Sequence, residues 1–168
     1  FASGARTQFS GSFKIGKIQS RFIAGAEYFN DRYFGRTMQN LYQANNDLGS
    51  LEGNLLASNN QTRQFYNVFA QLRLVFSQQF ELQTGLNVNK TKFELNNVHP
   101  ETSNQNYSYA AIYSPQASLL YKPDALKTIY FSVSRGFSLP SVEETLTATG
   151  TINSEIKPES GYNYEIGG

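Results

Sequence analysis

The sequence lacks cysteine and tryptophan, has one histidine and one methionine, and contains no long apolar run. A membrane helix needs about 20 consecutive apolar residues, whereas the runs here extend over only a few, so a helical membrane span is excluded. Because cysteine is absent, its usage does not indicate whether the protein resides in an oxidising or a reducing compartment. No nucleophile elbow, phosphate-binding glycine loop or metal-ligand cluster is present, so we expect neither an enzyme nor a metal or cofactor site.

Neither sign of charge is in excess, because 14 basic and 13 acidic residues leave a formal net charge of +1. The basic residues are spread singly along the chain rather than clustered in a stripe. Nucleic-acid binding needs such a cluster to neutralise phosphates. The composition therefore excludes nucleic acid as a partner.

What the sequence does contain is strict alternation, seen best over residues 79–95. Apolar or neutral side chains occupy one parity and polar ones the other: Phe80, Leu82, Thr84, Leu86 and Val88 against Glu81, Gln83, Gly85, Asn87 and Asn89. A period of two is typical of a strand with one apolar and one wet face. At about 3.3 Å per residue the run covers roughly 50 Å, far longer than ordinary strands of about 5 to 6 residues. This length predicts the wall of a transmembrane β-barrel.

The same alternation recurs along the chain, over 9–15, 22–28, 66–76, 111–121, 129–133 and 162–166. It predicts an all-β, antiparallel up-and-down meander of about seven long strands. We expect short connections at 16–19, 77–79 and 121–127, and long ones at 34–62, 96–107 and 138–158. Outer-membrane barrels have this asymmetry, with tight turns on the periplasmic side and long loops outside.

Aromatic residues gather near both predicted strand ends. Phe76, Phe80 and Tyr121 lie toward the short turns, and Tyr28, Tyr33, Phe34, Phe65 and Tyr66 lie toward the long loops. Trp and Tyr are enriched at the two interfaces of a bilayer. The pattern predicts two aromatic girdles.

The last fifty residues carry a recognisable series of motifs. A strand ends in Gly136 and Phe137 and leads to Pro140; a variable stretch follows; then come Lys157, Pro158 and Glu159, and a strand with Asn163, Tyr164, Glu165, Ile166 and Gly167. In this order they resemble the C-terminal barrel region of TonB-dependent outer-membrane receptors, particularly ferric-siderophore receptors. Earlier strands resemble that family only in architecture and alternation.

The resemblance implies a barrel of 22 strands around an N-terminal plug, in the outer membrane of a Gram-negative bacterium. It also implies import of a ferric siderophore or a similar scarce ligand, driven by the TonB complex through parts that this chain lacks. Residues 1–168 would then be a partial barrel domain in contact with outer-membrane lipid. Because the chain opens without a signal-peptide pattern and ends within a strand-like segment, we expect it to be part of a longer polypeptide.

Several motif residues have a structural reading of their own. Pro140 cannot donate to a ladder and suits the point where a strand ends, and Pro158 suits the residue before the returning strand. Gly136 would permit a bend. We expect Glu165 to pair with an interior cation, and Arg135, on the lipid-side parity, to reach the headgroup zone or follow a bulge.

Candidate ligand-binding residues lie in or near the predicted long loops. Arg36 and Arg63 could attract an anionic ferric complex, although ordinary surface charge explains them as well. Tyr107 and Tyr109 could stack on an aromatic ligand, or belong to the girdle. His99 could bind a ligand, although a lone loop histidine is usually solvated. The sequence does not identify the ligand.

Two further architectures compete with the receptor hypothesis. A small self-contained β-barrel would need an even strand count and sealed ends. A soluble β-sandwich binding module would need two packed sheets of shorter strands, with turns every 8 to 12 residues. The long uncharged outer faces and the C-terminal motifs favour the receptor.

Overall fold

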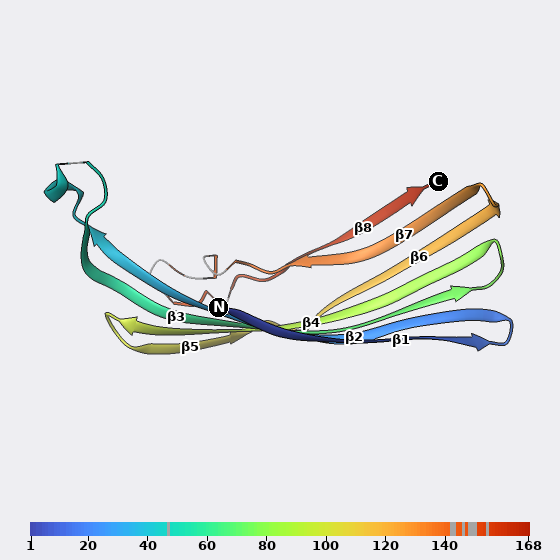
Figure 1. Cartoon of the computed structure of the whole chain (residues 1–168), viewed down its shortest axis with the longest axis horizontal. Coiled ribbons are helices and arrows are strands. Elements are labelled where there is room, and N and C mark those ends of the chain that lie inside the picture. The colour runs from blue at the N-terminus through green and yellow to red at the C-terminus, as the bar shows by residue number, and fades with distance from the viewer. Residues whose placement is uncertain (47, 142–143, 146, 148–150, 154) are drawn as a thin grey trace.

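The computed structural model describes residues 1–46, 48–141, 144–145, 147, 151–153 and 155–168, which form one antiparallel sheet (Figure 1). Its strands are β1 Ala2–Ile15, β2 Ile18–Asn40, β3 Glu52–Val75, β4 Phe80–His99, β5 Ser103–Ser108, β6 Ile112–Asp124, β7 Lys127–Ser138 and β8 Glu159–Gly167. A 3-10 helix, η1 (Tyr42–Asn45), connects β2 to β3. No helix in the described ranges is long and apolar enough to cross a membrane. The all-β meander is confirmed.

The strand order is β1-β2-β3-β4-β6-β7-β8, with β5 also beside β4. β5 pairs with residues 92–97 of β4, and β6 pairs with residues 80–89 of the same strand. β5 and β6 therefore act as two halves of one wall position, interrupted between Ser108 and Ile112. This gives seven positions, in agreement with the predicted number, and excludes a two-sheet sandwich for the described residues.

The short connections lie together at one end of the sheet, on the right in Figure 1, where the sequence predicts them. β1 turns into β2 at Gly16 and Lys17, and Gly16 has the left-handed φ of +59° that favours glycine. Residues 76–79 link β3 to β4, and residues 125–126 link β6 to β7. All three hairpins therefore reverse at the same end of the wall.

Two of the three long loops are much shorter than predicted. Strand β2 continues to Asn40 and β3 begins at Glu52, so residues 41–51 form the connection rather than 34–62. Strand β4 continues to His99 and β5 begins at Ser103, so the predicted 96–107 loop is reduced to residues 100–102. Where a strand extends beyond a membrane, both of its faces meet water. The sequence of such an extension does not alternate between apolar and polar side chains, and it therefore resembles a loop. The third connection, 139–158, has the predicted bounds.

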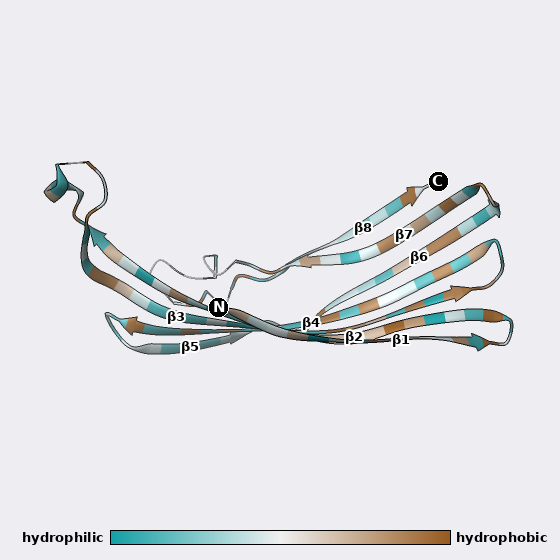
Figure 2. Ribbon diagram, viewed as in Figure 1, coloured by the Kyte–Doolittle hydropathy of each residue, from teal (hydrophilic) through white to brown (hydrophobic). Residues whose placement is uncertain are grey.

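The predicted apolar parity is in register across the whole sheet. One row runs through Phe22, Leu72, Thr84, Ala117, Val133 and Tyr164, and the next through Phe13, Ser20, Leu74, Leu82, Leu119, Phe131 and Ile166. Figure 2 shows the resulting alternation of brown and teal along the strands. Val68 is 60% and Ile166 77% exposed on this face. So extended an exposed apolar surface marks contact with a membrane or a partner.

The height of this apolar band matches a bilayer. On β4 it starts at Phe80 and ends at Val88, with Lys90 as the next residue of the same parity. These nine residues span roughly 30 Å along a strand, or roughly 22 Å when the strand tilts by about 40 to 45°. The apolar band of membrane barrels is about 25 Å tall. The sheet therefore has the dimensions of a membrane wall.

Aromatic pairs close the band at both ends. The rings of Phe80 and Tyr121 stack at 4.8 Å at the short-turn end, and those of Tyr28 and Tyr66 lie 5.1 Å apart at the other. Both predicted girdles are thus present. Tyr33 and Phe65 are two exceptions among the predicted girdle residues, because their pairing with Gln61 and Thr91 puts both on the opposite, polar face.

The polar parity forms the concave face and carries a chain of side-chain contacts across four strands. Arg6 Nη1 lies 3.0 Å from Glu27 Oε1, and Asn67 donates to Glu27 Oε2 at 3.2 Å. Asn89 donates to Asn67 at 2.8 Å and accepts from the Thr91 hydroxyl at 3.0 Å. Buried polar groups need such partners. These contacts connect the inner faces of β1 to β4 through side chains.

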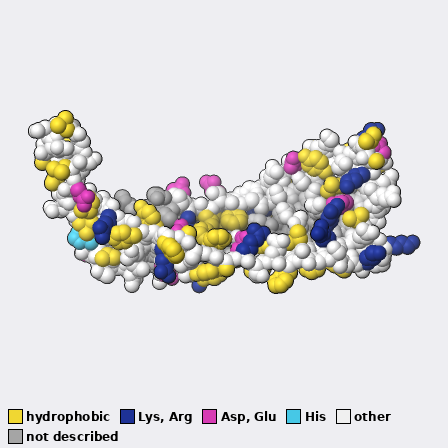
Figure 3. Space-filling model, viewed as in Figure 1, with side chains coloured by type: hydrophobic (Ala, Val, Ile, Leu, Met, Phe, Trp, Pro, Cys, Tyr) yellow, Lys and Arg dark blue, Asp and Glu magenta, His cyan; other side chains and the backbone are white. Residues whose placement is uncertain are grey.

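A second polar cluster lies nearer the short turns. Arg73 forms a bidentate pair with Glu81, both contacts being 2.6 Å. Gln83 donates to Glu81 at 3.0 Å, and Lys122 Nζ lies 3.9 Å from it. Figure 3 shows basic side chains gathered toward this end with an acidic one beside them. Glu81 thus neutralises cations from two neighbouring strands.

Candidate ligand-binding site on the concave face

The best-buried apolar residues lie on the concave face, beyond the apolar band. Leu95 is fully buried, and Phe93 and Tyr109 are each 3% exposed. The connection between β7 and β8 lies over them: Arg63 donates to the Pro140 carbonyl at 2.5 Å, and the amide of Ile152 donates to the side chain of Gln105 at 2.8 Å. This small core forms the base of the candidate site.

Three of the five predicted ligand-binding residues meet at this core. Arg63 of β3 and Tyr107 of β5 both pair with Phe93 of β4, so the three share one row of the concave face. The ring of Tyr107 meets that of Tyr109 edge-on, with centroids 4.9 Å apart and planes at 90°. A cation and two phenol rings therefore lie together. Such a set can bind an anionic aromatic group by charge and stacking.

Tyr109 sits at the break between β5 and β6 and is held by its backbone. Its amide donates to the Thr91 carbonyl at 3.0 Å, and its carbonyl accepts from Lys90 Nζ at 2.6 Å. Its buried hydroxyl has no hydrogen-bond partner among the described residues. Burial raises the pKa of this phenol, Tyr107 raises it further, and the Arg63 charge opposes the shift. The Tyr109 hydroxyl is therefore a buried hydrogen-bond donor beside the cavity, and a ligand would have to displace part of its surroundings to reach it.

A cavity of about 280 Å³ opens beside this break, between β6 and the β7–β8 pair. Pairing of β6 with β7 stops at Gln116 and Ser134, so the strands separate beyond that point. The cavity is lined by Tyr107, Tyr109, Tyr113, Arg135, Lys157 and Pro158, among others. Aromatic walls with two basic side chains extend the site of Arg63.

Arg36 and His99 lie elsewhere. Both pair with Ser58, so they share a row near the far end of β2, β3 and β4. Both are exposed, and the Arg36 guanidinium lies 4.8 Å from the ring of Phe34. The prediction placed them in loops, but they belong to strands. Within the described ranges no group of three acidic, histidine or cysteine residues could hold a metal ion.

The C-terminal motif residues build the β7–β8 hairpin. β7 ends at Ser138, two residues before Pro140, and β8 begins at Glu159 directly after Pro158, as the sequence predicts. The motif pairs in register: Gly136 with Gly161, Phe137 with Ser160, Ser134 with Asn163, Val133 with Tyr164, Ser132 with Glu165, Phe131 with Ile166 and Tyr130 with Gly167. Lys157 and Pro158 additionally line the cavity.

Two glycines of this motif differ in what they require. A Cβ on Gly167 would lie 2.6 Å from the ring and the hydroxyl of Tyr130, so a larger residue there would displace this ring and its hydrogen bond to Glu165. A Cβ on Gly136 would meet open space, and its φ is not in the left-handed region. The predicted bend at Gly136 therefore has no steric basis.

The two charged residues of the hairpin also have defined partners. Glu165 accepts a hydrogen bond from the Tyr130 hydroxyl at 2.8 Å, in place of the predicted cation. Arg135 keeps the lipid-side parity and donates to the Tyr113 carbonyl at 3.2 Å and the Ser160 hydroxyl at 3.1 Å. It thereby bridges β6 to β8 where the ladder between β6 and β7 has ended.

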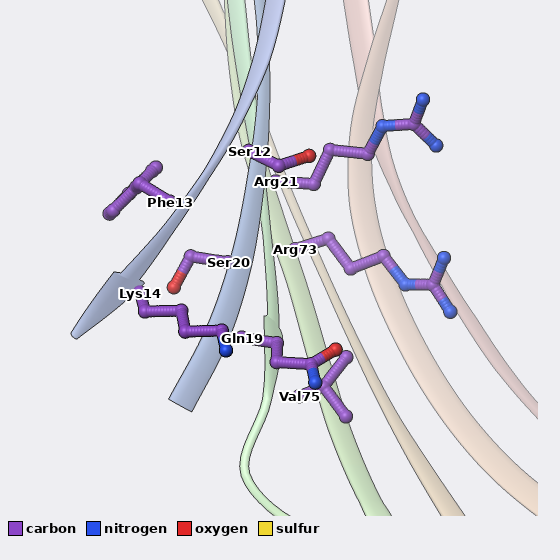
Figure 4. A pocket seen from close by; sticks show the side chains of 8 residues that line it. All are labelled: Ser12, Phe13, Lys14, Gln19, Ser20, Arg21, Arg73 and Val75. Carbon is purple, nitrogen blue, oxygen red and sulfur yellow. The ribbon is translucent and has the colours of Figure 1, made fainter. Parts of the chain in front are cut away.

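A larger cavity, of about 480 Å³, lies at the short-turn end of β1–β3. Figure 4 shows Arg21 and Arg73 pointing to one side of the sheet and Phe13 to the other. Its lining thus comes from both faces around edge strand β1, so it does not enclose a ligand. The smaller cavity near Tyr109 is also lined from both parities, since Tyr113 and Arg135 belong to the lipid-side one, but it adjoins the buried core of Phe93, Leu95 and Tyr109 and is therefore the better candidate.

Comparisons with known proteins agree with this geometry. All 168 residues match the family model described as "TonB dependent receptor-like, beta-barrel". The chain belongs to this family. Such receptors are outer-membrane proteins and not enzymes, in keeping with the two-faced wall. No curated protein matches the sequence.

Solved structures of two such receptors share the fold. The ferric-catecholate import receptor Fiu from E. coli K12 superposes with a TM-score of 0.73 at 15% identity. The siderophore receptor PiuA from Acinetobacter baumannii superposes with a TM-score of 0.67 at 20% identity. Each superposition covers 98% of this chain but only 28% and 29%, respectively, of the receptor. The chain thus corresponds to less than a third of such a TonB-dependent receptor.

Proposed function

We propose that this chain is part of the barrel wall of a Gram-negative outer-membrane receptor that imports a ferric siderophore or a similar scarce ligand. Its apolar face contacts outer-membrane lipid. The short turns face the periplasm, and the β2–β3, β4–β5 and β7–β8 connections face outward. Energy comes from the TonB complex through parts of the receptor outside residues 1–168.

One observation carries the ligand class: Arg63, Tyr107 and Tyr109 meet on the concave face beside a cavity that also holds Arg135 and Lys157. Ferric complexes of catecholate chelators are anionic and expose flat aromatic rings at their surface. Cations attract such complexes and phenol rings stack on them. The likeness to a ferric-catecholate import receptor supports the same class, although at 15% identity it supports the fold first.

The test is binding of a radiolabelled ferric tris-catecholate complex to outer membranes that contain the intact receptor. We expect Arg63→Gln and Tyr107→Leu each to weaken binding by roughly tenfold, since loss of one well-placed charge or stacking contact costs about 1 to 2 kcal/mol. Lys127→Gln, at the opposite end of the wall, is the matched control. Unchanged binding by correctly assembled Arg63 and Tyr107 variants would refute the proposed site.

A further inference from the structure

A row of polar side chains lies on the lipid-side parity one step beyond the Tyr28–Tyr66 pair. Its members all carry hydrogen-bonding groups: Ser3, Asn30, Gln64, Lys92 and Ser108. The next row outward contains Arg32, Thr62 and Glu94. The apolar face thus gives way abruptly to donors directly above its tyrosine girdle. Tyrosine girdles lie at the level of lipid headgroups.

Charge on this face is unevenly distributed. Beyond the apolar band, toward the long connections, the lipid-side parity of the paired strands carries the cations Arg32, Arg36, Lys90 and Lys92 and the carboxylates Glu52 and Glu94. Arg135 has the same parity but continues the row of Leu86 and Pro115, nearer the middle of the band. At the short-turn end the exposed Lys127 is already paired with Asp124 at 3.4 Å. Four cations against two carboxylates leave a surplus of positive charge on this part of the lipid-side parity, spread over several successive rows.

Arg32, Arg36 and Lys92 are available to a ligand, and Arg32 and Lys92 lie in adjacent rows, whereas Lys90 and the nearby Arg135 are already hydrogen-bonded. Lys90 donates to the Tyr109 carbonyl, and Arg135 bridges Tyr113 and Ser160. The ammonium of Lys92 instead lies 5.8 Å above the Tyr66 ring, and Lys92 and Arg32 are both exposed. Within the described residues, neither side chain forms an ion pair or hydrogen bond.

We propose that Lys92 and Arg32, with the Asn30 and Gln64 amides between them, bind the phosphate groups of anionic lipid headgroups at the outward-facing surface of the bilayer. The two cations lie on strands β4 and β2, in adjacent rows, with the amides of β2 and β3 filling the interval. Long basic side chains extend from an apolar stem to the headgroup level. Guanidinium and ammonium groups are the usual phosphate partners. This inference rests on the membrane position of the wall and is independent of the imported ligand.

The experiment is native mass spectrometry of the intact receptor in detergent, titrated with phosphatidic acid or phosphatidylcholine of identical acyl chains. We expect preferential retention of phosphatidic acid. The double variant Lys92→Gln/Arg32→Gln should lose this retention by roughly tenfold or more, because each basic side chain near an anionic surface contributes about 1 kcal/mol. Lys127→Gln should bind phosphatidic acid as the unmodified receptor does.

Three results would overturn the proposal. One is equal retention of the two lipids by the unmodified receptor. Another is unchanged retention of phosphatidic acid by a double variant that keeps the heat-modifiable gel mobility of a folded barrel. The third is displacement of the lipid by millimolar inorganic phosphate alone, which would assign the row to free phosphate. Retention of ferric-complex binding by the double variant would separate this surface from the concave-face site.

Discussion

Glu81 of β4 connects three strands of the polar face, because its side chain contacts Arg73 of β3 and Lys122 of β6. Its carboxylate, 6% exposed, accepts two hydrogen bonds from Arg73 and one from Gln83, and lies within 3.9 Å of Lys122. Arg21 pairs directly with Arg73 across the β2–β3 ladder. Without the carboxylate the exposed cations would face one another without a counter-charge, and the hydrogen-bond donors of Arg73 and Gln83 would lose their buried acceptor.

We therefore expect Glu81→Gln to lower the free energy of unfolding of the intact receptor by about 1 to 3 kcal/mol. The measurement is a urea titration of the receptor in lipid vesicles. Glu165→Gln, which alters an exposed contact to Tyr130, serves as the control and should cost less than about 1 kcal/mol. Equal effects of the two variants would contradict the role assigned to Glu81.

Gly167 provides a steric test of the β7–β8 hairpin. Because a Cβ there would collide with the Tyr130 ring, Gly167→Ala should destabilise the receptor by about 1 to 3 kcal/mol, the usual cost of overpacking. Gly136→Ala, where a Cβ meets open space, should be close to neutral. Adding Tyr130→Ala should remove most of the Gly167→Ala penalty in the same urea titration. Failure of that rescue would show that the collision is not the cause.

Leu86 lies near the middle of the apolar band and is 43% exposed there. Leu86→Arg should reduce folding stability in lipid by about 2 to 4 kcal/mol, the cost of arginine near a bilayer midplane. Gln71→Arg, on the polar face of β3, should cost much less because that side chain remains in water. A negligible effect of Leu86→Arg would mean that this face does not meet lipid.

At the scale of elements, the sequence was informative where one face meets lipid and the other water. The alternation around Leu86 predicted β4, and Pro140 and Pro158 predicted where the β7–β8 hairpin begins and ends. Beyond the band the signal vanishes, so the ends of β2, β3 and β4 were taken for loops, and Arg36 and His99 were misplaced with them. The meeting of Arg63 with Tyr107 depends on pairing through Phe93, which no local pattern contains.

The ends of β2 and β3 next to η1 allow a test of whether the alternating part of these strands assembles without the extensions beyond it. Deletion of residues 38–60 removes η1 and the strand ends, but leaves the Tyr28–Tyr66 girdle and the apolar rows below it. We expect the shortened receptor to assemble and to bind the ferric complex less well, because the removed segment borders the outward opening. Heat-modifiable gel mobility reports assembly. Its loss would mean that the outward hairpin is needed to build the wall.

At the scale of the whole molecule, the sheet is open, with β1 and β8 as its edges. Unpaired backbone groups at such edges cannot be exposed to lipid, so the proposed membrane position requires further strands to complete the wall. This agrees with a chain that covers less than a third of each superposed receptor. Ligand binding and transport are therefore properties to be measured on the intact protein.

The proposed receptor wall requires that one parity of these strands face lipid and the other a water-filled interior. The most direct test is spin-label accessibility at single cysteines introduced at residues 66–72 and 82–88 of the intact receptor in lipid vesicles, since residues 1–168 contain no cysteine of their own. We expect collisions with oxygen to peak at Val68, Ala70, Leu86 and Val88, and collisions with a water-soluble nickel chelate to peak at Asn67, Gln71, Gly85 and Asn87. Accessibility without a period of two, or with the two parities exchanged, would contradict the account.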